Sequence, residues 1–141
     1  MRKKRYKTMA LLLTGLLLSL PVSAYPEQTV RQAAAAVAAE CPEASFGVQI
    51  ALAAVIFNRM EDPQFGDTAA QVIWGDDFLT CTRTGRIAIP PEPAVYAQTL
   101  SAARRAAEGM DPTDGALWYG GGQTGRQFSR FRFADEGYFF Y

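Results

Sequence analysis

The sequence has no histidine, only two cysteines and no lysine after residue 7. The missing histidine excludes Ser-His-Asp and Cys-His catalysis and a His-ligated zinc site, and therefore argues against a zinc amidase or metallopeptidase. Two cysteines are too few for a four-thiolate metal site. No GxxxxGK[ST] phosphate loop or strand-anchored GxGxxG motif occurs, because Gly120-Gly121-Gly122 lacks the lysine and the spacing. We therefore expect no metal and no cofactor, and acid–base chemistry must come from carboxylates.

The first 24 residues read as a secretory leader. Five basic residues lie in the first seven positions, an apolar run covers Met9 to Leu20, and Pro21-Val22-Ser23-Ala24 follows. A cationic start, an apolar stretch and small residues at the cut are typical of a signal peptide. The run is shorter than the roughly 20 residues of a bilayer span. Residues 1–24 are thus predicted to be a signal peptide cleaved after Ala24, with an uncleaved N-terminal anchor as the alternative.

The predicted leader and the rest of the chain differ in net charge. It holds five of the 14 basic residues and no acidic ones, so residues 25–141 keep nine arginines against 14 acids, a net charge of −5. An acidic domain is a poor nucleic-acid binder, since phosphate neutralisation needs clustered positive charge. We expect one secreted or wall-associated domain over 25–141, with no nucleic-acid partner and no stable membrane span after cleavage.

Local signals predict helices first and strands last. Capping residues, apolar periodicity and helix stops predict four helices, and aromatic-rich stretches between glycine clusters predict three short strands. The helices are expected at Val30–Ala39 after Thr29, Phe46–Met60 after Ser45, Ala69–Trp74 after Asp67 or Thr68, and Ala94–Glu108. The strands are expected at Ala116–Tyr119, Gln127–Phe133 and Tyr138–Tyr141, and residues 76–91 are expected to form a loop with little regular structure.

Cys41 and Cys81 both lie in the part expected to be exported. An even cysteine count in an oxidising compartment favours one disulfide, which would stabilise the fold by about 3–4 kcal/mol on the loop-entropy model. Two buried thiols are the alternative.

Glu40 is the carboxylate that stands out by position. It falls on the same helical stripe as Ala33, Ala36 and Val37, at the end of an apolar face. Partial desolvation favours the neutral form that a general acid needs. The alternative is a glutamate that only caps or pairs at a helix end. Asp76-Asp77 forms a second carboxylate pair, which is typical of a solvated loop.

Aromatic residues crowd into the second half of the chain. They include Trp74, Trp118, Tyr119, Phe128, Phe131, Phe133 and the aromatic residues of the terminal stretch 138–141. Sugar rings bind on aromatic faces, so an acidic groove lined by tryptophan and tyrosine would suit glycan. Filling the core of a small domain is the plainer interpretation.

Several motifs in order resemble one enzyme family. Glu40-Cys41, Ser45-Phe46 and the run from Gln49 to Met60, which ends in Asn58-Arg59-Met60, resemble the catalytic domain of germination spore-cortex-lytic enzymes and related cell wall hydrolases. Further matches are Val72-Ile73-Trp74, Leu79-Thr80-Cys81-Thr82 with Gly85-Arg86-Ile87, Ala102-Ala103, Gly109, Asp111 to Tyr119 and the closing Phe140-Tyr141. The resemblance extends over residues 30–141. The sequence departs from the family pattern at Cys41-Pro42-Glu43-Ala44, at Tyr138, and at Leu79, which has Phe78 one place earlier.

The resemblance implies a small lysozyme-like α+β domain, helical in its N-terminal part with a short antiparallel sheet in its C-terminal part. It implies a lytic transglycosylase that cuts peptidoglycan glycan strands between N-acetylmuramic acid and N-acetylglucosamine, with Glu40 as the single acid and base. Family members that carry both cysteines support the Cys41–Cys81 bond. The implied substrate-binding residues are Gln49, Asn58, Phe78, Thr80, Trp118 and Tyr119.

Three other activities remain open at this point. A non-catalytic peptidoglycan- or glycan-binding domain would result if the departures have silenced the site. A muramidase would need a second carboxylate such as Asp76 or Asp77. A peptide-bond amidase is disfavoured by the missing histidine and metal set.

Overall fold

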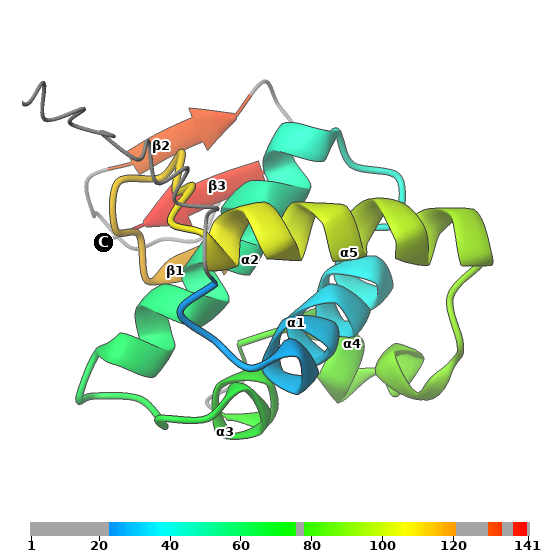
Figure 1. Cartoon of the computed structure of the whole chain (residues 1–141), viewed down its shortest axis with the longest axis horizontal. Helices are drawn as coiled ribbons and strands as arrows, with labels where there is room; N and C mark the ends of the chain where they lie inside the picture. Colours follow the sequence, from blue (N-terminus) through cyan, green and yellow to red (C-terminus); the bar gives the residue numbers. More distant parts are fainter. Residues whose placement is uncertain (1–22, 76–77, 121–129, 134–136, 141) are drawn as a thin grey trace, which may run out of the picture.

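The computed structural model describes residues 23–75, 78–120, 130–133 and 137–140. Most of the predicted signal peptide, the Asp76-Asp77 pair and residues 127–129 of the second predicted strand lie outside these residues. Five α-helices and a 3-10 turn precede three short strands, and the helices make up most of the described fold (Figure 1).

The first two helices bring the N-terminal half together. Helix α1 spans Glu27–Glu40, and α2 spans Phe46–Glu61. Helix α1 starts earlier than predicted, after Pro26 rather than after Thr29, and Glu27 places a negative charge at its positive end. Helix α2 agrees with the prediction, because the Ser45 side chain accepts a hydrogen bond from the Val48 N–H. All residues from Val48 to Phe57 are buried, which makes α2 the central helix.

Helix α3, Ala69–Trp74, has the start that its sequence predicts. The Thr68 hydroxyl accepts from the Gln71 N–H, and the Gln71 side chain reaches back to the Thr68 N–H. This reciprocal capping box explains how a six-residue helix can form. The predicted loop over 76–91 is wrong in part, because α4 (Thr80–Arg83) and the 3-10 turn η1 (Arg86–Ala88) lie within it.

Helix α5, Pro93–Ala107, packs across both α1 and α2. Its first residue is proline, whose missing N–H is not needed at a helix start. The contact surfaces are largely alanine: Ala33 and Ala34 in α1, and Ala102 and Ala103 in α5, are fully buried. Small side chains at a contact allow the two helix axes to approach closely.

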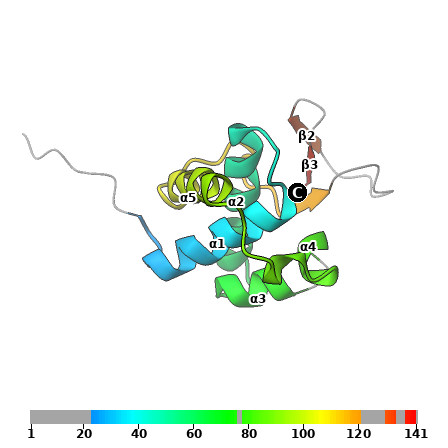
Figure 2. The ribbon, with the colours of Figure 1, turned by 90° about the vertical axis from the view of Figure 1, so that its right-hand side faces the viewer.

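The strands lie at one end of the helical body (Figures 1 and 2). Strands β1 (Trp118–Gly120), β2 (Arg130–Phe133) and β3 (Gly137–Phe140) form an antiparallel sheet in the order β1-β3-β2. In this register Tyr119 lies opposite Phe139, whose side chain is fully buried. The sheet therefore attaches to the helices through β1 and the Phe139 ring.

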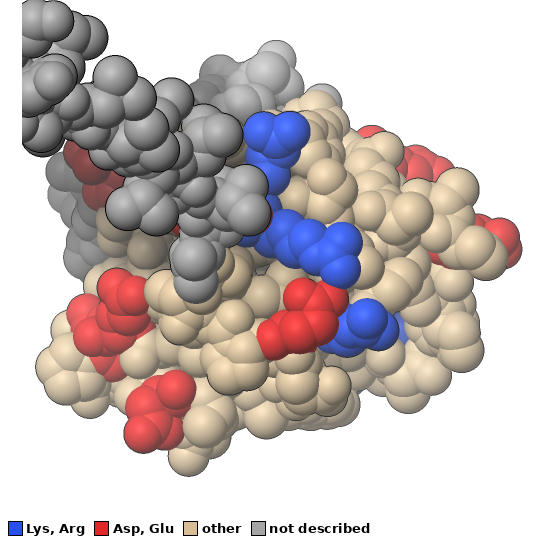
Figure 3. All heavy atoms as spheres, viewed as in Figure 1, with Lys and Arg blue, Asp and Glu red and all other residues tan. Residues whose placement is uncertain are grey.

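Charges of both signs meet on the surface. On the face drawn in Figure 3, arginine side chains lie next to acidic ones instead of forming a broad basic patch. Glu27, for example, pairs with Arg31 and Arg104. Within the described ranges, no helix combines the length and apolarity needed to cross a bilayer. The same residues contain no group of three or more His, Cys, Asp or Glu side chains placed to hold a metal ion.

Candidate active site

Glu40 is the last residue of α1, and its half-buried carboxyl group faces the start of α4. One oxygen, Oε2, accepts a hydrogen bond of 2.7 Å from the Cys81 N–H, and Oε1 accepts one of 3.2 Å from the Thr80 N–H. The first N–H groups of a helix have no partner within the helix, so a carboxylate is a natural acceptor for them. The carboxyl is thus held in one orientation by the backbone of a segment 40 residues later in the chain.

Two side-chain amides, those of Gln49 and Gln98, connect the C-terminal end of α1 to α5. The Gln49 Nε2 group donates to the Cys41 carbonyl at 3.4 Å, and Gln49 Oε1 accepts from Gln98 of α5 at 2.8 Å. Gln49 is 0% exposed, so its predicted contact with substrate is not supported. Its amide instead caps a carbonyl at the helix end beside Glu40, where carbonyl groups lack helical partners.

The structure does not show the predicted disulfide: Cys41 and Cys81 are both buried, and no bond joins their sulfur atoms. Each sulfur lies against a carbonyl of α1: Cys41 Sγ is 3.5 Å from Val37 O, and Cys81 Sγ is 3.9 Å from Ala36 O. Burial first, and then the neighbouring Glu40 carboxylate, raise the pKa of Cys81 to about 12. Since the thiolate is the reactive form, this environment keeps the Cys81 thiol protonated and resists its oxidation.

The thiols can be tested by alkylation without reductant. We expect iodoacetamide at pH 8 to leave Cys81 of the native protein unmodified, and to modify both cysteines once the chain is unfolded. Peptide mass mapping would identify each site. Unfolded protein that shows no alkylated cysteine until a reductant is added would contradict this result and restore the disulfide.

Two predicted aromatic residues meet at a side chain that sequence reasoning did not single out. The rings of Phe78 and Trp118 both lie within 4.4 Å of the guanidinium carbon of Arg59. The sequence does predict that Arg59 is buried, because it lies three and four residues after Ile56 and Val55 on a helix that is apolar on nearly every face. Tyr119 packs on Phe139, with ring centroids 5.3 Å apart.

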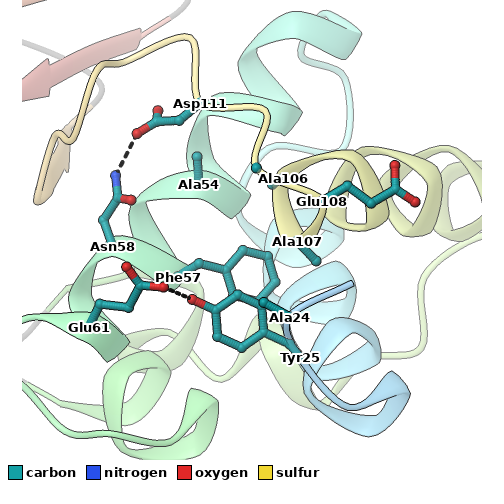
Figure 4. Close-up of a pocket in the computed structure, with 11 residues that line it drawn as sticks. Ala24, Tyr25, Ala54, Phe57, Asn58, Glu61, Ala106, Ala107, Glu108 and Asp111 are labelled. Carbon is teal, nitrogen blue, oxygen red and sulfur yellow. Dashed lines mark hydrogen bonds between the residues drawn. The ribbon is translucent and has the colours of Figure 1, made fainter. Parts of the chain in front are cut away.

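Asn58 lies on α2 and is bonded to the turn that precedes β1. Its Nδ2 group donates to Asp111 Oδ2 at 2.9 Å and to the Ala116 carbonyl at 3.1 Å. It also lines a hollow of about 240 Å³ between α2, the end of α5 and the segment at Tyr25 (Figure 4). Tyr25 precedes α1 and Glu40 ends it, so the Tyr25 wall of this hollow lies about one length of α1, roughly 20 Å, from Glu40. Asn58 therefore holds a turn, and its predicted contact with substrate is not supported.

Of the predicted site residues, the structure places Thr80 at the Glu40 carboxylate and Phe78 two residues before it in the chain, while Trp118 contacts Phe65 and Arg59. Thr80 supplies an N–H group to the carboxylate, and Phe78 stands two residues before it. Arg59 joins Phe78 to Trp118. The result is a half-buried carboxylate held by two backbone amides, with the buried Phe78 ring two residues before the first of them. A carboxylate held in this way can transfer a proton to or from a substrate that reaches it.

Comparison with known proteins gives a consistent result at three levels. A sequence model of the family described as Cell Wall Hydrolase matches residues 43–135. Spore cortex-lytic enzymes of Halalkalibacterium halodurans and Bacillus subtilis are each 32% identical over 95 residues, which are 67% of this chain but 28% and 30% of those enzymes. The chain thus matches about a third of the length of these relatives.

Two solved structures share the fold. The catalytic domain of the germination-specific lytic transglycosylase SleB from Bacillus anthracis aligns with a TM-score of 0.69 and 25% identity, over 85% of this chain and 99% of that domain. The catalytic domain of SleB from Bacillus cereus aligns with a TM-score of 0.71 and 26% identity, over 85% and 94%. The family match begins at residue 43, so Glu40 lies three residues outside it.

Proposed function

Because the chain belongs to the cell wall hydrolase family, we propose that its domain cleaves the glycan strands of peptidoglycan as a lytic transglycosylase. The bond cut is the one between N-acetylmuramic acid and N-acetylglucosamine. The observation that carries the proposal is the Glu40 carboxyl group, fixed by the N–H groups of Thr80 and Cys81. The similarity to SleB catalytic domains over most of the chain supports the same reaction class.

One carboxyl group is sufficient for this reaction. Glu40 in its acid form donates a proton to the glycosidic oxygen, which leaves as the C4 hydroxyl of N-acetylglucosamine. The C6 hydroxyl of the same muramic residue then bonds to C1, and Glu40 takes up its proton. The product carries a 1,6-anhydro ring, no water is consumed, and Glu40 returns to its acid form. An ordinary glycosidase would need a second carboxylate to activate water or to form a covalent intermediate.

The geometry at Glu40 suits both proton transfers. A carboxylate has about four lone-pair sites on its two oxygens, and the two backbone N–H groups use two of them. Sites therefore remain for the glycosidic oxygen and for the C6 hydroxyl. The amides also stabilise the carboxylate that forms after the first transfer, since hydrogen bonds to a charged acceptor are stronger than those to a neutral one.

Trp118, Thr80 and Tyr119 are the proposed glycan contacts, whereas Phe78, also predicted as one, is buried. Trp118 and Tyr119 are half-buried, so part of each ring is accessible. Phe78 is buried against Arg59 and supports the site from beneath. Thr80 is exposed beside the carboxylate that its N–H group holds.

Export to the wall is part of the same proposal. Tyr25, the first residue after the predicted cut, stacks on Phe57 with ring centroids 4.4 Å apart, and its hydroxyl donates to Glu61. Integration of this residue into the fold supports a domain that includes position 25, although the Ala24 N–H also donates to the Ala107 carbonyl. N-terminal sequencing of exported protein should start at Tyr25, and a retained leader would show that the N-terminus is an anchor.

Product analysis tests the reaction. Purified vegetative wall and spore cortex are digested separately with residues 25–141, and soluble fragments are examined by mass spectrometry. We expect fragments with 1,6-anhydromuramic ends, which are 18 mass units lighter than reducing ends because no water is added. Reducing muramic ends would identify a muramidase, and free amino groups an amidase. Binding to the wall without release of fragments would identify a glycan-binding domain.

A further inference from the structure

Arg59 lies on the last turn of α2 and is 1% exposed. Its guanidinium carbon is 3.8 Å from the ring centre of Phe78, 4.3 Å from that of Phe65 and 4.4 Å from that of Trp118. Its Nε group also donates a hydrogen bond of 2.6 Å to the Leu117 carbonyl. The three rings come from three separate segments of the chain: the turn after α2, the stretch before α4, and the first residue of β1.

A buried arginine is suited to this environment for a physical reason. The guanidinium group is flat, delocalised and weakly hydrated, so it stacks on aromatic faces while its N–H groups bond at the edge. The negative faces of the rings attract the cation in place of water. Lysine would keep the charge but lose both the flat stacking surface and the fork of donors.

Two of the three rings around Arg59, those of Phe78 and Trp118, lie on segments of the proposed site. Trp118 starts β1 and is one of the proposed glycan contacts. Phe78 leads into the segment whose Thr80 and Cys81 N–H groups hold the Glu40 carboxylate. Leu79, between them, is fully buried, so a shift of the Phe78 ring cannot be absorbed by a loose connection.

We propose that Arg59 is a positioning residue for the active site. Its guanidinium group fixes the Trp118 ring against which the glycan stacks. Through Phe78, it also fixes the backbone amides that orient Glu40. The inference rests on the proposed function, but its structural half concerns the two rings and can be measured without substrate.

The experiment uses Arg59→Lys and Arg59→Met in residues 25–141 that carry Trp74→Phe. Trp74 is 63% exposed and the chain has two tryptophans, so this background leaves Trp118 as the sole tryptophan. Acrylamide quenching then reports the order of the Trp118 ring. Soluble glycan strands serve as substrate for kcat and KM, at a temperature where thermal unfolding shows each variant to be fully folded.

We expect both variants to raise the acrylamide quenching constant of Trp118 at least twofold and to raise KM. We expect kcat to fall at least tenfold. Val30→Ala is the matched control, because Val30 is buried in α1 near the end opposite Glu40. This control should lower the melting temperature while leaving Trp118 quenching and kcat unchanged.

Unchanged quenching and unchanged kcat in folded Arg59→Lys would overturn the proposal. So would losses that merely follow the unfolded fraction, as in Val30→Ala. If the Arg59 variants do not fold, Phe78→Leu tests the Phe78 link, since it keeps the arginine and removes one ring. It should lower kcat, and full kcat in that variant would also reject the proposal. A failure of the proposed function is distinguishable, because the unmodified domain would then release no fragments with 1,6-anhydromuramic ends, while Trp118 quenching would still report the effect of Arg59 on the ring.

Discussion

Glu40→Gln is expected to lower the rate of glycan cleavage by at least about 100-fold, the smaller end of the range for loss of a general acid–base group. The amide of glutamine cannot donate a proton to a leaving oxygen and take one back. Its size matches that of the carboxyl, and its oxygen can still accept from the Cys81 N–H, so the fold should be preserved. The release of soluble fragments from purified wall measures the rate.

Glu43→Gln is the matched control for that variant. Glu43 lies three residues further on, is exposed, and carries the same charge. It should release fragments at the rate of the unmodified protein. A Glu40→Gln protein that remains active, with an unchanged melting temperature, would remove Glu40 from the mechanism and direct attention to Asp76 and Asp77.

Asp111→Ala is expected to lower the free energy of unfolding by about 2–4 kcal/mol, because four donors, two of them on the buried Thr113, would lose their acceptor. Asp111 Oδ1 accepts from the N–H and the hydroxyl of Thr113, and Oδ2 accepts from Asn58 and from the Gly115 N–H. These bonds hold the turn that leads into Trp118. Urea unfolding measures the loss.

The control for Asp111 is Asp114→Asn in the same turn. Asp114 is exposed and has a left-handed backbone with φ of 54°, which asparagine also tolerates. It should change the free energy of unfolding by less than about 0.5 kcal/mol, as is usual for surface positions. Equal losses in the two variants would show that the turn backbone matters and not the Asp111 carboxylate.

The pH dependence of the Asp111 contribution has a definite sign. Burial alone raises the pKa of Asp111, but hydrogen bonds from Thr113, Asn58 and the Gly115 N–H outweigh it and hold the pKa below the ordinary 3.8. The unfolded chain therefore binds its proton at higher pH than the folded chain. The stabilisation is fully present above about pH 4 and is lost as pH falls through the folded pKa. The stability difference between wild type and Asp111→Ala should be constant from pH 7 to 5 and shrink below pH 4.

Local signals predicted the helices that have strong caps. Ser45 and Thr68 each supply a side-chain acceptor to their own helix, so α2 and α3 begin where the sequence indicates. Helix α4 escaped prediction because four residues carry less than two turns of periodicity. The start of α1 also escaped, because Thr29 resembles a cap but lies inside a helix that begins two residues earlier.

The sequence singles out Glu40 as a candidate, but it does not predict the backbone amides that hold its carboxyl group. Glu40 stood out by its place on an apolar stripe, whereas its partners are backbone amides, and an amide carries no sequence signature. Gln49 and Asn58 were assigned to substrate because they occur in family-like motifs. Their bonds to Cys41 and to Asp111 depend on tertiary contacts that spacing along one helix does not reveal.

Two hydrogen bonds, from Gln98 to Gln49 and from Gln49 to the Cys41 carbonyl, connect an exposed side chain of α5 to the buried end of α1. Gln98 is exposed, yet it supplies the donor for Gln49 Oε1, which has no access to solvent. An aliphatic residue at position 98 would leave that oxygen without this donor and unable to turn to water. A substitution at this exposed position, whether engineered or natural, would therefore change the hydrogen bonding at the C-terminal end of α1, next to Glu40.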